Sequence, residues 1–545
     1  MHDLVIRNAL LLDGLGSPPR RGDLAIASGK IAQVGSVHGK TRESIDADGL
    51  ALMPGIIDNH THYDAQITWD PWASPSPSLG VTTAVIGNCG FTIAPCREKD
   101  RELVMKNLTQ VEGMSLAALR AGIRWEFESL PEYLDMLERR GAALNLACFA
   151  GHSSIRTYVM GTAASERAAT PPEVDEMKGI LVEAMRAGAI GLSSTTSPAH
   201  NGEGGRPMPS RLADEAELRA LVGCLRDAQR GVFMLTKGGQ TRIPFLESLA
   251  AESGRPVVIA ALLHSSTNPN AVFEDLEEIE EANDRGHRLL GAVSCCPLSM
   301  EFTLHSPYVL EGLDSWKPAL PLKGEAFKAK LRDKAFRSAI RAELSQPAHF
   351  RLFNGEWDKV QVVESQRTIA EIAGNADPLD CMLDLALKEN LDTVFNALLL
   401  NSDEDAVGRM LRHPSSLVSL SDAGAHLTFF NDAGFGLHLL GHWTRELGVL
   451  SLAEAAWRLS GHPAAVFGIE QRGALKPGFH ADLLLFDPAR VGRGPMKRTF
   501  DLPAGEPRLT AQAVGVHGVW VNGSCIVGKK ASEALPGRLL RQFSA

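Results

Sequence analysis

The sequence lacks a long apolar run, a patterned set of cysteines, internal repeats and low-complexity tracts. No stretch reaches the ~18 uninterrupted apolar residues that a membrane helix needs. The N-terminus has no basic segment followed by an apolar core, so we expect no signal peptide. Eight cysteines are scattered over the chain, which favours reduced thiols over a disulfide framework. These absences predict a cytoplasmic protein without a membrane partner.

The sequence also has no excess of positively charged residues. The net charge is −10 at pH 7, which argues against a nucleic-acid partner. The remaining composition is that of an ordinary globular protein, with 44% apolar and 22% charged residues. A chain of 545 residues is long enough for a large core and more than one domain.

Both ends of the chain contain short strand-like segments that end in turn residues. Near the N-terminus these segments are residues 3–14 and 23–35, the second with a tight turn at Ser28-Gly29. Similar segments near the C-terminus cover residues 481–487 and 514–523. Because neither end is large enough to fold alone, we expect a small β-sandwich domain built from residues 1–51 and 468–545.

Between these ends, apolar strands alternate with helical segments, which is the pattern of a parallel α/β domain. The expected strands cover residues 52–58, 82–87, 144–150, 189–194, 231–236, 256–263, 289–293 and 417–421. Eight β/α units over about 400 residues predict a (β/α)8 TIM barrel, here over residues 52–467. The stretch of about 297–392 has no obvious barrel strand and reads as an insertion. It either covers the mouth of the barrel or serves oligomer contacts.

Two histidines follow the first apolar strand with a spacing of i, i+2. They are His60 and His62. Side chains two apart on an extended strand point the same way, so one strand can give two imidazoles to one metal ion. The alternative is an ordinary His-x-His sequence in a loop. Candidate ligands after other strands favour the metal site.

In a (β/α)8 barrel the active site lies at the carboxyl ends of the strands. Cys89 follows the second strand, although a free cysteine is more often a small buried hydrophobe. His264 follows the sixth strand, where a core histidine is the alternative. Asp422 follows the eighth strand and is either a helix N-cap or a carboxylate that binds metal and moves a proton. Together these residues predict metal-activated hydrolysis, with Asp422 passing a proton from water to the leaving nitrogen.

Other polar residues near the predicted strand ends are candidates for substrate binding. His152 and His200 follow the third and fourth strands, and His426 lies four residues after Asp422. Arg206 is a weaker candidate for holding a substrate carboxylate. Loop positions, or support for the metal ligands, are equally compatible with these residues.

Several motifs resemble those of the amidohydrolase superfamily. The run Pro-Gly-x-x-Asp-x-His-Thr-His at residues 54–62, with a β domain from both termini, is similar to that superfamily. More narrowly, four segments resemble the N-acyl-D-amino-acid deacylase (D-aminoacylase) family. They are residues 62–66, 80–90, 188–193 and 473–483. The resemblance covers nearly the whole chain and implies zinc-dependent cleavage of N-acylated D-amino acids. It also implies a metal-binding cysteine on strand 2, here Cys89, in place of a carboxylated lysine on strand 4.

One position departs from the family pattern. The family places a metal-binding histidine at the end of strand 5, where this chain reads Thr236-Lys237-Gly238. Lys237 replaces that ligand if it is carboxylated, binds a substrate carboxylate if it stays an ammonium, or is a solvated loop residue. Alternatively, one metal is held by His60, His62 and Asp422, with Cys89 or His264 contributing. Either one or two Zn²⁺ ions are therefore compatible with the sequence.

The leading expectation is a metal-dependent hydrolase that cleaves the amide bond of N-acylated amino acids, of D configuration by resemblance, or of related N-acyl compounds. A cyclic amide, a lactone or another C–N bond is the alternative substrate, because fold does not fix substrate. A non-catalytic scaffold is favoured only by the missing strand-5 histidine. The expected partner is a small N-acyl molecule, and the superfamily resemblance also allows a homo-oligomer.

Overall fold

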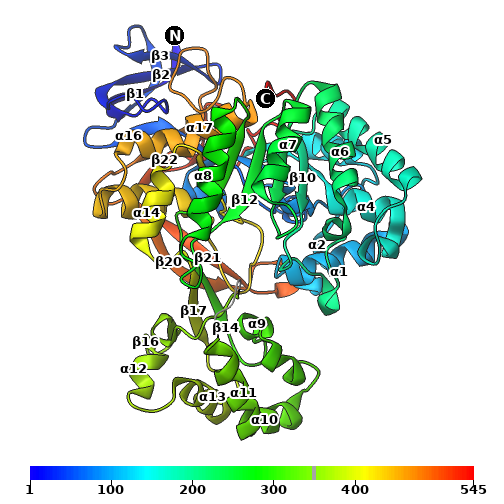
Figure 1. Ribbon diagram of the computed structural model, residues 1–545. Coiled ribbons are helices and arrows are strands. Elements are labelled where there is room, and N and C mark those ends of the chain that lie inside the picture. Colours follow the sequence, from blue (N-terminus) through cyan, green and yellow to red (C-terminus); the bar gives the residue numbers. More distant parts are fainter. Residues whose placement is uncertain (347–350) are drawn as a thin grey trace.

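The computed structural model describes residues 1–346 and 351–545. Residues 347–350, inside the predicted insertion, lie outside the described part of the chain. A mixed α/β body carries a separate lobe, and both termini lie at the end of the body that faces away from the lobe (Figure 1). Among the helices of the described residues, none is long and apolar enough to cross a membrane.

Each of the eight stretches expected to be strands overlaps at least one strand, and the strands of the body pair in parallel. They form two sheets with the orders β6-β7-β8 and β9-β10-β11-β12-β13-β18. Only Phe149 separates β8 from β9, so the chain passes directly from the first sheet into the second. The strands are β6 (Ile56–Asp58), β7 (Val81–Ile86), β8 (Asn145–Cys148), β9 (Ala150–Gly151), β10 (Gly191–Thr195), β11 (Val232–Thr236), β12 (Val257–Leu262), β13 (Leu289–Val293) and β18 (Ser416–Val418).

Hydrogen bonds also connect the remaining edge strands of the two sheets, which are β6 and β18. Asn59 Nδ2, directly after β6, donates to the carbonyl oxygen of Val418 at 2.9 Å. Ser419 Oγ donates to Asn59 Oδ1 at 2.5 Å, and Thr61 forms a parallel bridge with Ala423. These contacts place the residues that follow β6 beside the residues that follow β18.

Helices between the strands pack around the parallel sheets (Figure 1). The helix α5 illustrates why they form where they do. Its N-terminus has a capping box between Thr170 and Glu173 and begins with Pro171, and its C-terminus is followed by Gly188 at a φ of 106°. The helices of the body are α1 (Arg101–Val111), α2 (Leu116–Gly122), α3 (Leu130–Arg140), α4 (His152–Met160), α5 (Pro171–Ala187), α6 (Glu215–Ala228), α7 (Ile243–Ser253), α8 (Ala271–Asp284), α14 (Glu404–Arg412), α15 (Phe435–His438), α16 (Leu452–Ala456) and α17 (His462–Phe467).

A further sheet combines strands from both ends of the chain. Its order is β23-β22-β19-β5-β1-β2-β3, and β4 pairs with β1. Its apolar side chains form a cluster that includes Leu24, Leu52 and Trp520. The strands are β1 (His2–Leu11), β2 (Arg20–Ala27), β3 (Lys30–Gly35), β4 (Thr41–Asp46), β5 (Ala51–Pro54), β19 (Leu483–Phe486), β22 (Val516–Val521) and β23 (Ser524–Val527). A separate hairpin consists of β20 (Gly492–Thr499) and β21 (Arg508–Val514).

Gly55 connects this terminal sheet to the parallel strands of the body. It stands between β5 and β6, and its N–H donates to the carbonyl oxygen of Asp482 at 2.8 Å. A Cβ atom at this position would lie 2.1 Å from Cγ2 of Thr82. Only glycine fits there, which accounts for the Pro-Gly pair that precedes the two histidines.

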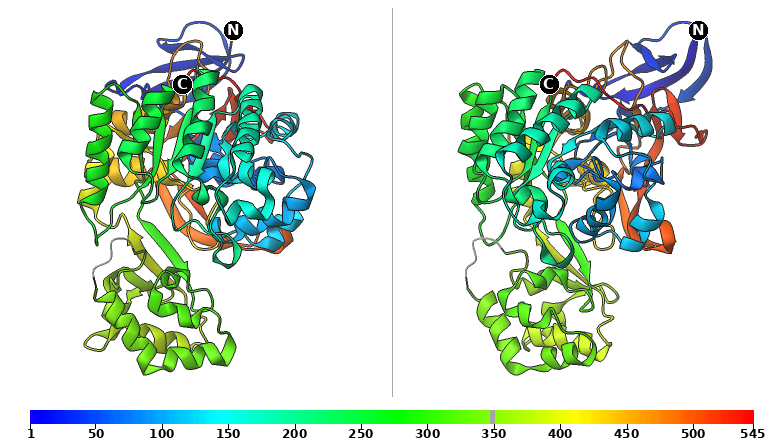
Figure 2. Two further views of the ribbon diagram at one scale, coloured as in Figure 1. Left: turned by 45° about the vertical axis from the view of Figure 1, so that its right-hand side comes forward. Right: turned by 90° about the vertical axis from the view of Figure 1, so that its right-hand side faces the viewer.

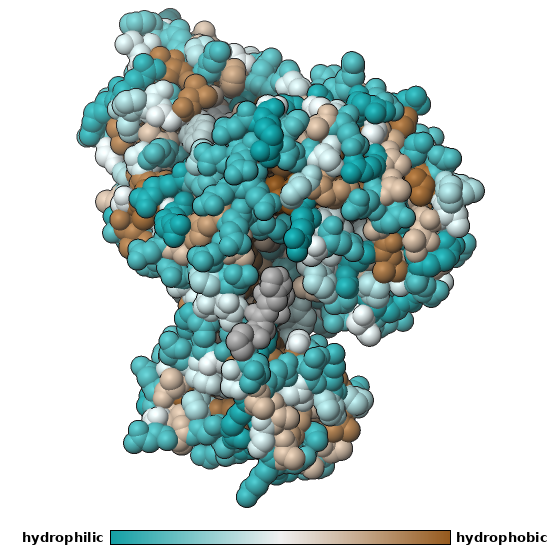
Figure 3. Space-filling view, in the orientation of Figure 1, coloured by the Kyte–Doolittle hydropathy of each residue, from teal (hydrophilic) through white to brown (hydrophobic). Residues whose placement is uncertain are grey.

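The lobe contains the described residues from β14 to β17. It has an antiparallel sheet of order β14-β17-β15-β16 and a hydrophobic core of its own around Trp316. Only a narrow connection joins the lobe to the body (Figures 2 and 3). Glu301 and Tyr308 of the lobe contact Phe429, in the loop that follows Asp422. Its elements are β14 (Leu298–Phe302), α9 (Tyr308–Glu311), α10 (Gly324–Arg332), α11 (Lys334–Leu344), β15 (Val360–Val362), β16 (Arg367–Thr368), α12 (Ile369–Ala373), α13 (Pro378–Lys388) and β17 (Phe395–Leu400).

Candidate metal centre

The two histidines after β6 are held inside the body. His60 and His62 are 2% and 5% exposed, and their ring centroids lie 5.3 Å apart. Asp58, at the end of β6, accepts hydrogen bonds from Ser421 Oγ at both carboxylate oxygens, at 2.8 and 2.7 Å. Burial raises the pKa of Asp58 to about 7, against the effect of these bonds. The end of β6 is thereby fixed to the chain that follows β18.

Cys89 follows β7, and its thiol lies close to both histidines. Its Sγ lies 3.4 Å from Nε2 of His60 and 4.0 Å from Nε2 of His62. Burial raises the pKa of the Cys89 thiol. A bound metal ion reverses this effect, because a thiol that coordinates a metal is deprotonated.

Asp422, beyond β18, contacts both histidines. Its Oδ1 lies 3.2 Å from Nε2 of His60 and 3.6 Å from Nε2 of His62. Burial alone would raise the pKa of Asp422, but the nearby histidines outweigh burial and lower that pKa. The carboxylate is therefore held in its charged form.

The backbone at this site is strained at several non-glycine residues. Cys89, Leu420, Asp422 and His426 have φ angles of 55°, 64°, 46° and 55°. Non-glycine residues rarely adopt this left-handed region, and such residues persist where surrounding structure enforces them, often at functional sites. These four residues belong to two segments, the turn after β7 and the loop after β18, and all of them line the hollow beside the two histidines.

This donor set fits a divalent metal ion. The ligand atoms of His60, His62 and Cys89 lie within 4.8 Å of one another, and all three residues are buried. Imidazole, thiolate and carboxylate are the ligands that zinc takes in proteins, and Asp422 supplies the carboxylate.

Glu112, which the sequence did not single out, supports this cluster from the end of α1. Its Oε1 lies 3.1 Å from Nδ1 of His62, and the residue is 2% exposed. Burial lowers the pKa of His62, but the charge of Glu112 and the other contacts of the ring outweigh burial and raise it. In the sequence Glu112 appears only as a polar residue that ends an amphipathic helix, so no local signal connects it to His62.

A hollow of about 50 Å³ borders the cluster. His200 and His426, two of the predicted substrate contacts, lie in its wall. His200 Nδ1 is bonded to Thr195 Oγ1 at 2.8 Å. The lining residues are His60, His62, Cys89, Phe91, Val111, Glu112, His200, Thr236, Ala261, Leu420, Asp422 and His426.

His264 and Lys237 are not among the residues that line this hollow in the described part of the chain. The backbone of His264 exchanges two hydrogen bonds with Asn401, and its ring lies near Phe273. Lys237 forms an ion pair with Asp275 at the start of α8. Neither side chain therefore joins His60, His62 and Cys89 in this structure.

Two further predicted contacts, His152 and Arg206, also lie outside the hollow. Both ring nitrogens of His152 are engaged at 2.8 Å, one by Ser194 and the other by Glu217, in a fully buried network. Arg206 lies at the surface and pairs with Glu166 at 3.2 Å.

At the ends of β11 and β12, the side chains that face the cluster are Thr236 and Ala261. Thr236 Oγ1 lies 3.1 Å from Sγ of Cys89. The next residue, Lys237, lies beyond the end of β11 and pairs with Asp275 instead. At the end of β11, the side chain beside the cluster is thus a hydroxyl group rather than the amine of Lys237.

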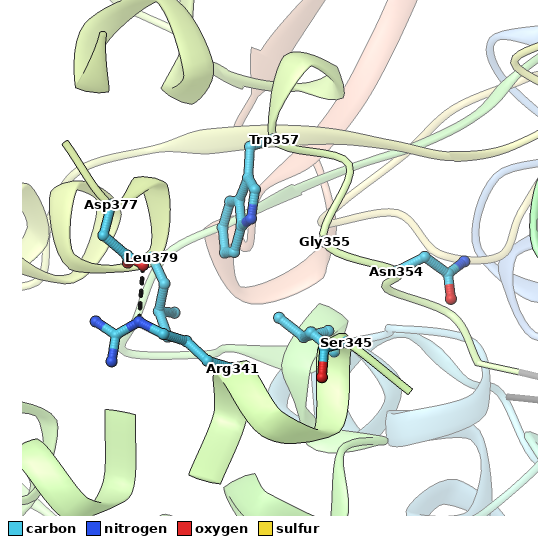
Figure 4. Close-up of a pocket in the computed structure, with 8 residues that line it drawn as sticks. Arg341, Ser345, Asn354, Gly355, Trp357, Asp377 and Leu379 are labelled. Atoms are coloured by element: carbon cyan, nitrogen blue, oxygen red, sulfur yellow. Dashed lines mark hydrogen bonds and ion pairs between the residues drawn. The ribbon is translucent and has the colours of Figure 1, made fainter. Parts of the chain in front are cut away.

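A larger hollow, of about 220 Å³, lies within the lobe. It is lined in part by Trp357 and by Arg341, which pairs with Asp377 at 2.7 Å (Figure 4). Within residues 1–346 and 351–545, the compact group of metal-ligand side chains is the one at His60. The candidate metal ligands therefore line the smaller hollow rather than the larger one.

A family model described as the amidohydrolase family matches residues 43–527. The chain belongs to this family. Over 100% of its length it is 29% identical to D-aminoacylase of Alcaligenes xylosoxydans xylosoxydans, of which 98% is covered. It is 28% identical to N-acyl-D-aspartate deacylase of the same organism, with 99% and 95% of the two chains covered.

A crystal structure of D-aminoacylase is similar over 99% of this chain and 100% of that chain, with a TM-score of 0.69 and 25% identity. A second D-aminoacylase structure, with the same scores, is described as having a binuclear metal centre. The predicted family is confirmed, and with it the predicted class of enzyme, a metal-dependent amidohydrolase.

Proposed function

We propose that this amidohydrolase removes the acyl group from N-acylated amino acids or related N-acyl compounds. The observation that carries the proposal is the convergence of His60, His62, Cys89 and Asp422 at one buried point. Its relatives over the full chain length include D-aminoacylase and N-acyl-D-aspartate deacylase.

We further propose that these parallel strands, with β8 and β9 counted as one barrel strand, form a closed (β/α)8 barrel. Asn59 and Thr61 support closure, because they bond the chain after β6 to Val418 and Ala423. The domain boundaries predicted above remain part of this proposal.

One zinc ion is the cofactor that we propose for this site, held by His60, His62, Cys89 and Asp422. Thr236 and Ala261 stand at the two positions on β11 and β12 that face the cluster, and neither supplies a strong ligand. Bound here, zinc supplies a Lewis acid that polarises the substrate carbonyl and makes water a better nucleophile.

The protein's own groups then move the proton and hold the substrate. Asp422 carries a charged carboxylate that accepts the proton of the attacking water and delivers it to the leaving nitrogen. Water supplies the hydroxyl group to the carbonyl carbon as the C–N bond breaks. His200 and His426, in the wall of the hollow, are the proposed substrate contacts.

The test combines metal analysis with hydrolysis of N-acetyl derivatives of D- and L-amino acids and of their carboxamides. We expect about one equivalent of zinc per chain and release of the free amine. Asp422→Asn should lower kcat by roughly 10²–10⁴-fold without changing the unfolding midpoint. Asp405→Asn, an exposed aspartate on α14, is the matched control. A protein that loads zinc but hydrolyses none of these compounds would contradict the proposal.

A further inference from the structure

The imidazole of His200, in the wall of the hollow at the metal centre, is held in a fixed orientation. Oγ1 of Thr195, the last residue of β10, lies 2.8 Å from Nδ1 of the ring. Phe91 forms an edge-to-face pair with the ring, with centroids 5.1 Å apart. The carbonyl oxygen of His200 accepts hydrogen bonds from the N–H of Met208 at 3.2 Å and from Nη1 of Arg211 at 3.0 Å. Contacts of the Nδ1 edge, the ring and the backbone therefore fix the position of His200.

The hydroxyl group of Thr195 determines which ring nitrogen of His200 carries the hydrogen. A hydroxyl group has one hydrogen to donate and two lone pairs with which to accept. Thr195 Oγ1 donates to the carbonyl oxygen of Thr236 at 3.3 Å and accepts from the N–H of Ser197 at 3.1 Å. The remaining lone pair is left for Nδ1 of His200, which therefore carries the hydrogen and donates it. The opposite tautomer would take the hydroxyl hydrogen and lose the hydrogen bond to Thr236.

The second ring nitrogen of His200, Nε2, is a free hydrogen-bond acceptor. Burial and the nearby histidines lower the pKa of His200 to about 3, and a bound metal ion would act in the same direction, so the ring is neutral. With the hydrogen on Nδ1, Nε2 carries only a lone pair. Among residues 1–346 and 351–545, Nε2 has no hydrogen-bond partner, although the side chain lines the hollow. The wall of the hollow thus contains an acceptor that the protein itself does not use.

The amide that is cleaved in an N-acyl substrate carries one donor for such an acceptor, its own N–H. The carbonyl oxygen has no hydrogen to donate, so a bare Nε2 cannot bind it. The hollow measures only about 50 Å³, which keeps an amide that reaches the metal close to the wall. A hydrogen bond from the N–H to Nε2 fixes the rotation of the nitrogen and leaves its lone pair for the proton that Asp422 delivers.

We infer that His200 accepts a hydrogen bond from the N–H of the amide that is cleaved, and that Thr195 positions His200 for this contact. The inference rests on the proposed function, since it concerns the substrate of the same hydrolysis. It predicts that the site selects acyl compounds with an N–H at the bond that breaks over esters of the same shape.

A pair of substrates that differ only at this atom tests the contact. N-acetyl-D-phenylalanine and O-acetyl-D-phenyllactic acid share the acyl group, the side chain, the configuration and the carboxylate, but the ester has oxygen in place of N–H. His200→Phe should lower kcat/KM for the amide roughly tenfold and for the ester less than about twofold, because only the amide loses a hydrogen bond. Equal losses for both compounds would overturn the inference. So would a loss of zinc from His200→Phe, because His200 would then be a metal ligand.

Nitrogen-15 NMR of the zinc-loaded protein tests the role of Thr195 without turnover. The chemical shifts of the two ring nitrogens show which of them carries the hydrogen, and the His200 signals are assigned by their loss in His200→Phe. We expect the hydrogen on Nδ1 in the parent and in Thr195→Ser, which keeps the hydroxyl group. In Thr195→Val it should move toward Nε2. Hydrogen on Nε2 in the parent, or the same tautomer in Thr195→Val, would overturn the inference.

The same signals separate failure of the inference from failure of the proposed function. If the parent protein hydrolyses neither compound, the proposed function is rejected, and both compounds are then titrated into the zinc-loaded protein. A change in the Nε2 chemical shift with the amide but not with the ester supports the inference. Equal changes with both compounds, or no change with either, overturn it.

Discussion

Glu112 and His62 contact each other on the edge of the imidazole that faces away from the metal centre. Oε1 of Glu112 lies 3.1 Å from Nδ1, whereas Nε2 on the other edge lies 3.6 Å from Asp422. A carboxylate at the second nitrogen of a metal-binding histidine fixes the ring orientation and increases its basicity. We expect Glu112→Gln to weaken metal affinity roughly 10–100-fold, measured by competition with a chelator of known affinity.

Glu102→Gln is the matched control for this prediction. Glu102 lies on the same helix, α1, but pairs at the surface with Arg120. Its replacement should leave metal affinity unchanged. If both variants lost affinity equally, Glu112 would have no particular role in positioning His62.

His60 and His264 are expected to differ sharply in their importance for metal binding. The backbone of His264 holds its position through Asn401, and its side chain does not line the hollow in the described residues. His264→Ala should therefore retain the metal content of the parent protein. His60→Ala should lower it to less than about half, because the cluster loses one of its four proposed ligands. Elemental analysis after dialysis measures both, and metal loss in His264→Ala alone would require a different ligand set.

The strands of the body could be predicted because they are short apolar runs between turn residues. In β12, Val257–Leu262, the run is uninterrupted, and helices such as α5 carry clear caps at both ends. These are local signals that need no knowledge of distant contacts. The lobe was less predictable, because β14 and β17 pair across roughly ninety intervening residues, a contact that no local pattern reveals.

The site residues that follow a strand directly could be predicted. The roles of residues whose side-chain direction is set only by the folded chain could not. His60, His62, Cys89 and Asp422 converge as the strand ends imply. His264 lies two residues beyond the end of β12, where period-two alternation no longer fixes side-chain direction. Glu112 comes from a helix end, and its contact with His62 exists only in the folded chain.

Thr236 and Ala261 occupy the positions from which β11 and β12 face the cluster. Histidine at both positions would add two imidazoles near Cys89 and create a second set of ligands. We expect the Thr236→His/Ala261→His double variant to bind about two metal ions per chain, compared with about one in the parent. Elemental analysis of the folded protein tests this, with Thr236→Ser as the control that keeps the hydroxyl group. Unchanged stoichiometry in the double variant would show that these side chains do not reach the metal.

A buried ion pair away from the metal centre gives a prediction for stability. Glu217 on α6 is 2% exposed and forms an ion pair with Arg156, while His152 bonds to it at 2.8 Å. Burial alone would raise the pKa of Glu217, but His152 and Arg156 lower it from 4.5 to about 2. Breaking such a pair from one side leaves a buried charge, so Glu217→Gln should lower the free energy of unfolding by ~3 kcal/mol at neutral pH.

The pH dependence follows from the direction of this shift. Since the folded protein binds the proton of Glu217 more weakly than the unfolded chain does, its stabilisation is complete above a pH of about 4.5 and decreases as the pH falls toward about 2. The stability difference between the parent and Glu217→Gln should therefore be largest at neutral pH and smaller near pH ~3. Urea unfolding at both pH values measures it, with Glu215→Gln, an exposed glutamate on the same helix, as the control. A difference that stayed constant with pH would mean that the charge of Glu217 does not stabilise the fold.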